Sequence, residues 1–206
     1  MDDLAREYVN SFYTRSLRMF GDRPEAVRWT REGQLMRYRT LLDIGGAIGG
    51  SRVLDFGCGK GDFLSFLKER NIAVRYTGLD INENLIALAK QKNPDASFSV
   101  FDLEKDTLNE DFDYIFLCGV FNLKVQGIQE TIRKTLTTLF PRCRRGMAFN
   151  GLSSLTPQKD FELHYLAPEE MLSFAVENLS PFVSLRHDRF SHDVTLFIYR
   201  HANPVA

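Results

Sequence analysis

The feature that most constrains the fold is a strand that runs into three glycines at every second position. The stretch from Arg52 to Asp62 reads RVLDFGCGKGD. Its apolar first half predicts a strand buried on both faces. Gly57, Gly59 and Gly61 let the backbone turn sharply and approach a ligand closely, because they carry no Cβ. The helix predicted next directs its positive N-terminal end at the same point, so this loop is suited to holding a small ligand.

The spacing of these glycines argues against a phosphate site. A dinucleotide fingerprint, G-x-G-x-x-G, would need a glycine where Asp62 stands, and a carboxylate there would repel a pyrophosphate. A P-loop needs G-x-x-x-x-G-K-[ST], and Lys60 stands in a different frame. What remains is D-x-G-x-G-x-G, beginning at Asp55. A second acid, Asp80, closes the next predicted strand in the segment YTGLD.

With these residues the chain resembles the class I S-adenosylmethionine-dependent methyltransferases, whose first motif is similar to VLDFGCGKG and whose second strand ends in an acid. The resemblance spans about residues 51–200. It implies S-adenosyl-L-methionine as the cofactor and S-adenosyl-L-homocysteine as the product. Because this cofactor carries an ammonium and a sulfonium, acids around the loop suit it. Another Rossmann-like ligand-binding protein is the alternative, since single motifs produce false matches.

From residue 51 the pattern alternates strand and helix, which predicts a parallel sheet with helices on both faces. After the first strand, further strands are predicted at 74–80, 97–102, 112–119 and 147–150, and two β runs at 182–187 and 194–199 predict a hairpin. Two helices, 2–20 and one from Pro24 to Leu42, precede the sheet. The expected fold class is α/β: a Rossmann-like, doubly wound, mostly parallel seven-stranded sheet with an antiparallel C-terminal hairpin and an N-terminal helical cap. We expect residues 1–50 to form the cap and 51–206 the S-adenosylmethionine-binding methyltransferase domain.

Composition narrows the class of partner. The chain has 206 residues, of which 44% are hydrophobic, and a formal net charge of −1. This near-neutral balance favours a small-molecule acceptor over nucleic acid. No run of about 18 apolar residues predicts a membrane span, and three cysteines at unrelated spacings suggest neither a disulfide framework nor a zinc site. We therefore expect a cytoplasmic protein, with an oligomeric state that the sequence does not indicate.

The resemblance assigns cofactor contacts to residues at the strand ends. Asp80 is expected to accept hydrogen bonds from the ribose hydroxyls. Asp102 and Leu103 are expected at the adenine, although a surface turn explains Asp102 equally well. Arg37, in the N-terminal cap, is a candidate for the methionine carboxylate, against the alternative of a solvated helix face. The full set of expected cofactor contacts is Arg37, Asp55, Gly57, Gly59, Gly61, Asp80, Asp102, Leu103 and Cys118.

Acceptor contacts are expected where the fourth strand ends and in the loop at 151–167. Trp29, Phe121, Asn122 and Asn150 are the candidate substrate residues, each of which also suits ordinary packing or strand-end structure. His164 and Tyr165 are the candidate catalytic bases, because an imidazole takes a proton near neutral pH. His187 and His192 lie on the predicted hairpin without the pattern of an open metal site, so no metal is expected.

These observations predict methyl transfer to an O, N or S atom of a small molecule by in-line displacement. Two alternatives stay open at this point. One is a noncatalytic S-adenosylmethionine-binding module, since a fold does not imply a function. The other is a non-methylating reaction of the same cofactor that releases methylthioadenosine.

Overall fold

Seven strands form one sheet with the spatial order β3-β2-β1-β4-β5-β7-β6. The computed structural model describes residues 1–202, so the predicted domain end at residue 206 lies outside the described residues. The strands β1 to β5 pair in parallel, and β7 runs antiparallel to both β5 and β6. Their bounds are β1 Arg52–Phe56, β2 Arg75–Asp80, β3 Ser97–Val100, β4 Phe112–Cys118, β5 Cys143–Leu152, β6 Val183–Arg186 and β7 Asp193–Tyr199. The predicted doubly wound sheet with a C-terminal hairpin is confirmed.

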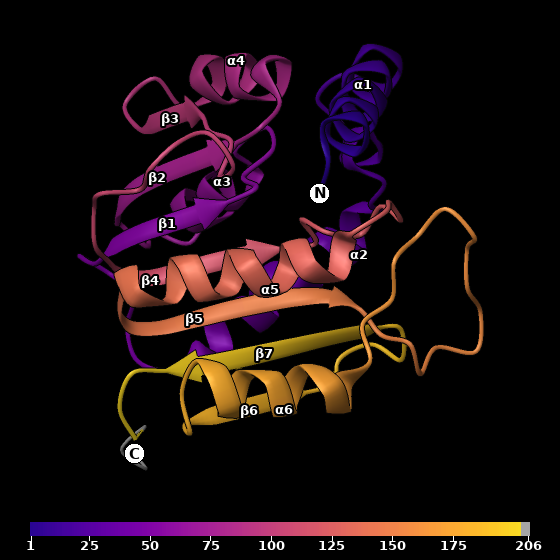
Figure 1. The fold of residues 1–206 in the computed structure, drawn as a ribbon. Coiled ribbons are helices and arrows are strands. Elements are labelled where there is room, and N and C mark those ends of the chain that lie inside the picture. Colours follow the sequence, from indigo (N-terminus) through magenta and orange to yellow (C-terminus); the bar gives the residue numbers. More distant parts are fainter. Residues whose placement is uncertain (203–206) are drawn as a thin grey trace.

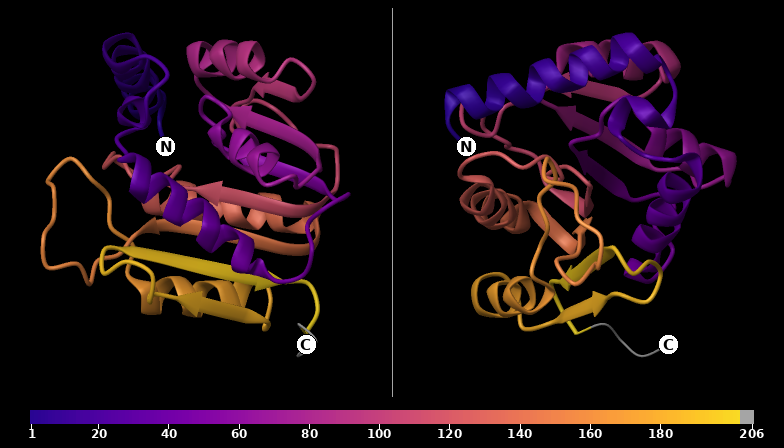
Figure 2. Two further views of the ribbon diagram at one scale, coloured as in Figure 1. Left: turned by 180° about the vertical axis from the view of Figure 1, so that it is seen from behind. Right: turned by 90° about the vertical axis from the view of Figure 1, so that its right-hand side faces the viewer.

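Helices cover both faces of the sheet (Figures 1 and 2). One face carries α5 and α6, and the other carries α2, α3 and α4, each face with its own apolar core. The α-helices are α1 Asp3–Phe20, α2 Arg31–Leu41, α3 Asp62–Glu69, α4 Glu83–Lys92, α5 Ile128–Leu139 and α6 Pro168–Asn178. Three short 3-10 helices are η1 Pro24–Val27, η2 Leu42–Ile44 and η3 Phe140–Arg142. The central strands are buried on both sides, which explains the continuous apolar runs of β1 and β4.

The order of the strands reverses between β1 and β4. The chain leaves β1 toward β2 and β3 on one side, and from β4 it continues toward β5 on the other. At such a point the connections after the two neighbouring strands separate, and a crevice opens outside their carboxyl ends. The glycine-rich turn after β1 and the segment after β4 therefore border the same space.

Two sequence expectations about the elements are wrong in extent. The single helix expected from Pro24 to Leu42 is interrupted, because Arg28 adopts φ 60° and Thr30 begins α2 as its N-cap, accepting a hydrogen bond from the Gly33 N–H at 3.1 Å. The fifth strand, expected over 147–150, extends over Cys143–Leu152 because β4 and β7 pair with it on both sides. Neither difference changes the predicted topology.

Helix α1 differs from the other helices in how it is held. Of its 18 residues only Ala5 is buried. Figure 2 shows α1 lying across the end of the molecule at which the parallel strands finish, apart from the two helical layers. Helix α2, by contrast, packs on one face of the sheet. The division into a cap at residues 1–50 and a domain at 51–206 stays a prediction.

Candidate functional site

The turn after β1 is shaped by its glycines. Gly57, Gly59 and Gly61 have φ of 74°, 53° and 74°, a region that side chains rarely adopt. A Cβ on Gly57 would lie 2.5 Å from Cγ2 of Val120, in the segment after β4. The turn and that segment are thus in direct contact, and only glycine permits the contact.

Two acids lie beneath and beside this turn without a cation partner among the described residues. Asp80, at the end of β2, accepts the Gly59 N–H at 2.8 Å on one oxygen and the Asn82 N–H at 2.8 Å on the other. Asp55, at 3% exposure, accepts the Tyr76 hydroxyl at 2.5 Å. Burial raises the pKa of Asp55 to about 7 and also raises the pKa of Asp80. Both acids line a cavity at the carboxyl edge of the sheet.

Asp102 and Leu103 line the same cavity just beyond β3. The Asp102 carboxylate accepts the Glu104 N–H at 3.0 Å and lies 3.5 Å from Nε of Arg6. Asp102 therefore belongs both to a turn and to the cavity wall. The two interpretations given for it from the sequence, a surface turn and an adenine contact, are compatible. With Asp55 and Asp80, three successive strand ends place an acid on one cavity.

Helix α1 supplies a wall of this cavity that the sequence analysis did not assign. Arg6, Val9 and Tyr13 line the cavity, and their spacing of three and four residues places them on one helical face. Burial raises the pKa of Tyr13 well above the usual range, and the nearby Asp80 carboxylate raises it further. The helical spacing of these three residues is the sequence pattern that could have indicated this shared face.

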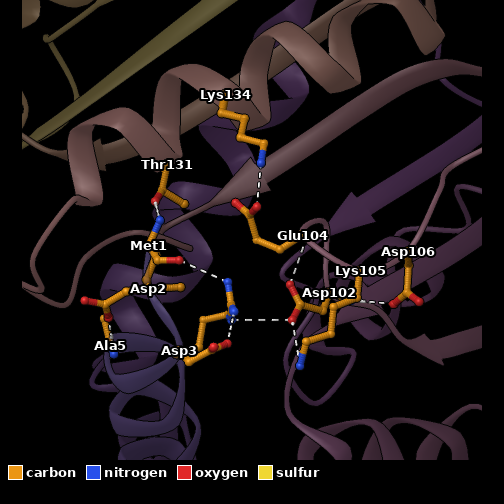
Figure 3. Close-up of polar contacts among 11 residues, drawn as sticks. Met1, Asp2, Asp3, Ala5, Asp102, Glu104, Lys105, Asp106, Thr131 and Lys134 are labelled. Carbon is orange, nitrogen blue, oxygen red and sulfur yellow. Dashed lines mark hydrogen bonds and ion pairs between the residues drawn. The ribbon is translucent and has the colours of Figure 1, made fainter.

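Polar contacts hold α1 over the cavity (Figure 3). The Met1 amino group donates to Thr131 Oγ1 of α5 at 2.6 Å, and Arg6 donates to the Met1 carbonyl oxygen at 3.0 Å. Farther along, the Asn82 side-chain amide donates to the backbone oxygen of Asn10 at 2.9 Å. The cap thus contacts α5 and the segment that follows Asp80.

A buried charge network ties the end of α1 to the glycine turn, and sequence reasoning missed it. Lys60 is 2% exposed and lies 2.5 Å from Asp62 and 3.0 Å from Asp22. Lys92 of α4 approaches the same two acids at 2.6 and 2.8 Å. These cations lower the pKa of Asp62 against the effect of its burial. The network explains why charged residues stand inside the turn.

The other end of the cavity is formed by Trp29, Phe121 and Cys118, as the sequence predicted for a common site. The Trp29 ring lies on the turn after β4, where a Cβ on Gly119 would come within 2.5 Å of Cζ2. Its ring also meets Tyr38 edge-on, with centroids 5.9 Å apart. Burial raises the pKa of the Cys118 thiol well above its usual range, which keeps the thiol neutral.

Arg37 does not have the position expected of a carboxylate ligand. Its Nε and Nη2 atoms each lie 2.7 Å from an oxygen of Asp193, and both side chains are 7% exposed. Arg37 is not among the described residues that line the cavity. Its guanidinium lies 5.1 Å from the centre of the Trp29 ring, behind the cavity wall. The sequence pattern could not reveal this, because Asp193 is 156 residues away.

Four further candidates lie outside the cavity wall as the described residues form it. The Asn150 amide donates to Thr195 Oγ1 at 3.0 Å, within the sheet. The backbone oxygen of Asn122 accepts the His164 N–H at 2.8 Å, and the Tyr165 hydroxyl accepts the Asp160 N–H at 2.7 Å. Burial lowers the pKa of His164, which favours its neutral form. The structure brings His164 beside Asn122 but brings neither side chain to the cavity.

Within residues 1–202, no three His, Cys, Asp or Glu side chains are gathered so that they could hold a metal ion. Over the same range, no helix has the length and apolar character needed to cross a membrane.

Comparison with known proteins supports a methyltransferase. Residues 54–146 match the family model described as a methyltransferase domain. A curated protein of Mycobacterium tuberculosis, provisionally named a methyltransferase, is 26% identical over 150 residues, which cover 70% of this chain and 90% of that protein.

Solved structures agree with this at the level of the fold. Magnesium protoporphyrin IX methyltransferase from Synechocystis, with bound S-adenosylhomocysteine, superposes with a TM-score of 0.68 at 18% identity, covering 96% of this chain and 99% of that one. Phosphoethanolamine N-methyltransferase 1 of Haemonchus contortus gives 0.70 at 12% identity, covering 100% of this chain and 51% of that one. The matched domain, the relative and the glycine-and-acid motif together indicate a methyltransferase domain over residues 54–146 that uses S-adenosylmethionine.

Proposed function

We propose that this methyltransferase acts on a small molecule, transferring the methyl group to an O, N or S atom. The observation that carries the proposal is one cavity bounded by the glycine turn, by Asp55, Asp80 and Asp102 at three strand ends, and by an aromatic wall at Trp29. The cavity is covered by α1, which suits a small acceptor that can be enclosed with the cofactor. The net charge of −1 further favours such an acceptor over a polyanion.

The residues of the cavity fit the cofactor. Each carboxylate oxygen of Asp80 accepts one backbone N–H and has capacity for a second hydrogen bond, so the ribose hydroxyls can both be accommodated. Asp55 has no cation partner among the described residues and suits the ammonium of the methionine part. Leu103 and Asp102 are proposed to hold the adenine, and Cys118 to pack beside the cofactor. The glycines of the turn let the backbone approach the cofactor closely.

The bound cofactor supplies an electrophilic methyl carbon on a sulfonium. A bond from the acceptor atom to this carbon forms as the carbon–sulfur bond breaks, and the electron pair of that bond stays on sulfur. A proton carried by the acceptor atom leaves to a base or to water. Trp29 and Phe121 orient the acceptor and exclude water, so that positioning supplies much of the rate enhancement.

His164 and Tyr165 stay predictions as bases, because they would need the loop at 153–167 to move toward the cavity. Asn122 and Asn150 likewise stay predictions as substrate contacts. His164 is the better candidate of the two bases, since burial already favours the neutral imidazole that can accept a proton.

The test begins with calorimetric titration of the protein with S-adenosylmethionine and with S-adenosylhomocysteine. We expect micromolar binding of both, and a loss of affinity of about tenfold or more in Asp80→Ala, the scale of one or two charge-assisted hydrogen bonds. Asp95→Ala is the matched control, because Asp95 is an exposed acid that pairs with Lys68 outside the cavity. Equal affinities of the two variants would contradict the cofactor placement.

The mass of the products then distinguishes the reactions. S-adenosylhomocysteine with an acceptor heavier by one methyl group supports the proposal. Methylthioadenosine would instead assign the non-methylating reaction, and tight binding without turnover on a broad acceptor panel would assign a binding module.

A further inference from the structure

The two ends of the cavity differ in charge. Around Asp80 the wall includes Arg6, Asp102 and Glu104, all of them charged. The glycine turn adds the charged residues Asp55, Lys60 and Asp62 to the wall. Beyond the turn, the wall includes Val27, Trp29, Cys118, Gly119, Val120 and Phe121, none of which has a charged side chain at neutral pH. If the adenosine part lies near Asp80, as the proposed function requires, the uncharged end receives the acceptor.

Trp29 is the largest side chain at this end and is held in place from several directions. Gly119 lies against one edge of its ring, and Tyr38 meets the ring at an interplanar angle of 66°. The guanidinium of Arg37 lies 5.1 Å from the ring centre, a cation–π distance. A ring fixed in this way presents a preformed flat apolar surface to a ligand.

Two cations close to this end, Arg37 and Arg28, are already paired inside the protein. Arg37 is paired with Asp193 through two contacts of 2.7 Å. Arg28 pairs with Asp160 and Glu162, each at 2.8 Å, and so connects η1 to the loop at 153–167. Among the described residues an anionic acceptor group finds no free cation here, and the unpaired acid nearby, Asp55, is assigned to the ammonium of the cofactor in the proposed function. A charged acceptor group would therefore lose its hydration without a counter-ion, which disfavours it strongly.

We propose that the acceptor is an uncharged molecule with an aromatic body that stacks on Trp29. Aromatic rings gain both apolar burial and favourable ring–ring geometry against such a wall. This inference rests on the proposed function for the position of the cofactor. It separates the chain from its structural neighbour that is named for phosphoethanolamine, a substrate carrying both a phosphate and an ammonium.

The single tryptophan of the chain makes the test direct. Fluorescence of Trp29 is followed in the presence of saturating S-adenosylhomocysteine while three probes with one benzene ring are titrated: benzyl alcohol, benzylamine and phenylacetate. We expect saturable quenching by benzyl alcohol, at a dissociation constant at least about tenfold lower than that of the cationic or the anionic probe, because only the neutral probe keeps no charge to desolvate. A charged probe that binds as tightly as benzyl alcohol, or the absence of any saturable response, would overturn the inference.

Variants separate this inference from the proposed function. In calorimetry, Trp29→Ala should weaken benzyl alcohol about tenfold and Trp29→Phe about threefold, since a phenyl ring keeps part of the wall. Phe161→Ala is the control, because Phe161 is an aromatic residue 86% exposed outside the cavity and should change nothing. Circular dichroism establishes that each variant is folded. Failure of S-adenosylhomocysteine itself to bind would contradict the proposed function, whereas binding of S-adenosylhomocysteine without benzyl alcohol contradicts only the acceptor class.

Discussion

Two acids at the glycine turn and the ion pair behind Trp29 bury charge in two opposite ways. Among residues 1–202, Asp55 and Asp80 are countered only by hydrogen-bond donors of the protein. Behind Trp29, Arg37 and Asp193 neutralise each other. A buried charge left without a counter-ion is costly unless a ligand supplies one, whereas a closed pair serves the fold. The difference supports the proposed cationic ligand at the turn and a structural role for the pair behind Trp29.

The largest effect is expected from opening the closed pair. Arg37→Ala leaves Asp193 buried without its partner and should lower the free energy of unfolding by about 3–5 kcal/mol, measured by urea denaturation. The double variant Arg37→Met, Asp193→Leu should recover most of this loss, because no charge is then left uncompensated. Its affinity for S-adenosylhomocysteine should stay within about threefold of the wild type. A large loss of affinity in the double variant would restore Arg37 as a cofactor ligand.

Asp55, the unpaired acid at the turn, predicts that the free energy of unfolding depends on pH. The folded protein holds the Asp55 proton up to a pKa of about 7, while the unfolded chain releases it near its ordinary value. Between these values unfolding releases a proton, so the contribution of Asp55 to stability is present at low pH and is lost as pH rises toward 7. The loss is on the order of 4 kcal/mol.

Asp55→Asn removes this titration and keeps the size of the side chain. Its free energy of unfolding should exceed that of the wild type increasingly from pH 5 to pH 8. Cofactor affinity of the wild type should rise over the same range, because the ionised carboxylate attracts the ammonium. Parallel stability profiles for the two proteins would mean that Asp55 does not titrate in this range.

A smaller effect is expected from filling the contact between the two regions. Gly57→Ala places a methyl group 2.5 Å from Val120 at φ 74°, and should cost about 2–3 kcal/mol of stability as well as cofactor affinity. Gly50→Ala has the same φ of 74° with no atom within 4 Å of the added Cβ, so it measures the backbone cost alone. Equal destabilisation of the two variants would show that Val120 moves aside without cost.

The smallest effect concerns the half-exposed pairs of Arg28. Arg28→Gln should change the free energy of unfolding by less than about 1 kcal/mol, since such pairs contribute little. Cleavage by trypsin after Lys159 should nevertheless become several-fold faster, because the loop at 153–167 loses a tether. Arg39→Gln, at an exposed arginine of α2, is the control and should leave the cleavage rate unchanged.

The glycine turn and its surroundings could be predicted from the sequence, because the residues that indicate them are close together in the chain. The strand of β1, the three glycines and the first turn of α3 follow one another within a few residues, and each has a distinct physical requirement. Asp80 and Asp102 could be placed because parallel strands end at one edge. The break at Arg28 could not be predicted, since a positive φ in an arginine is imposed by its tertiary contacts and has no residue signature.

The wall at Trp29 could not be predicted from the sequence in the same way. Trp29 lies on Gly119, and Arg37 pairs with Asp193, across separations of 90 and 156 residues. His164 was chosen for its chemistry alone, and the fold leaves its side chain outside the cavity wall.

By itself the sequence determined the sheet, the direction of its strands, the glycine turn and the acids at the strand ends, because periodicity and backbone conformation are properties of short segments. Only the tertiary structure decided which charges are paired, which face of α1 lines the cavity and which residues form the wall at Trp29. Those outcomes depend on packing between distant segments, where the cost of an unpaired buried charge and the space beside a glycine select the partners.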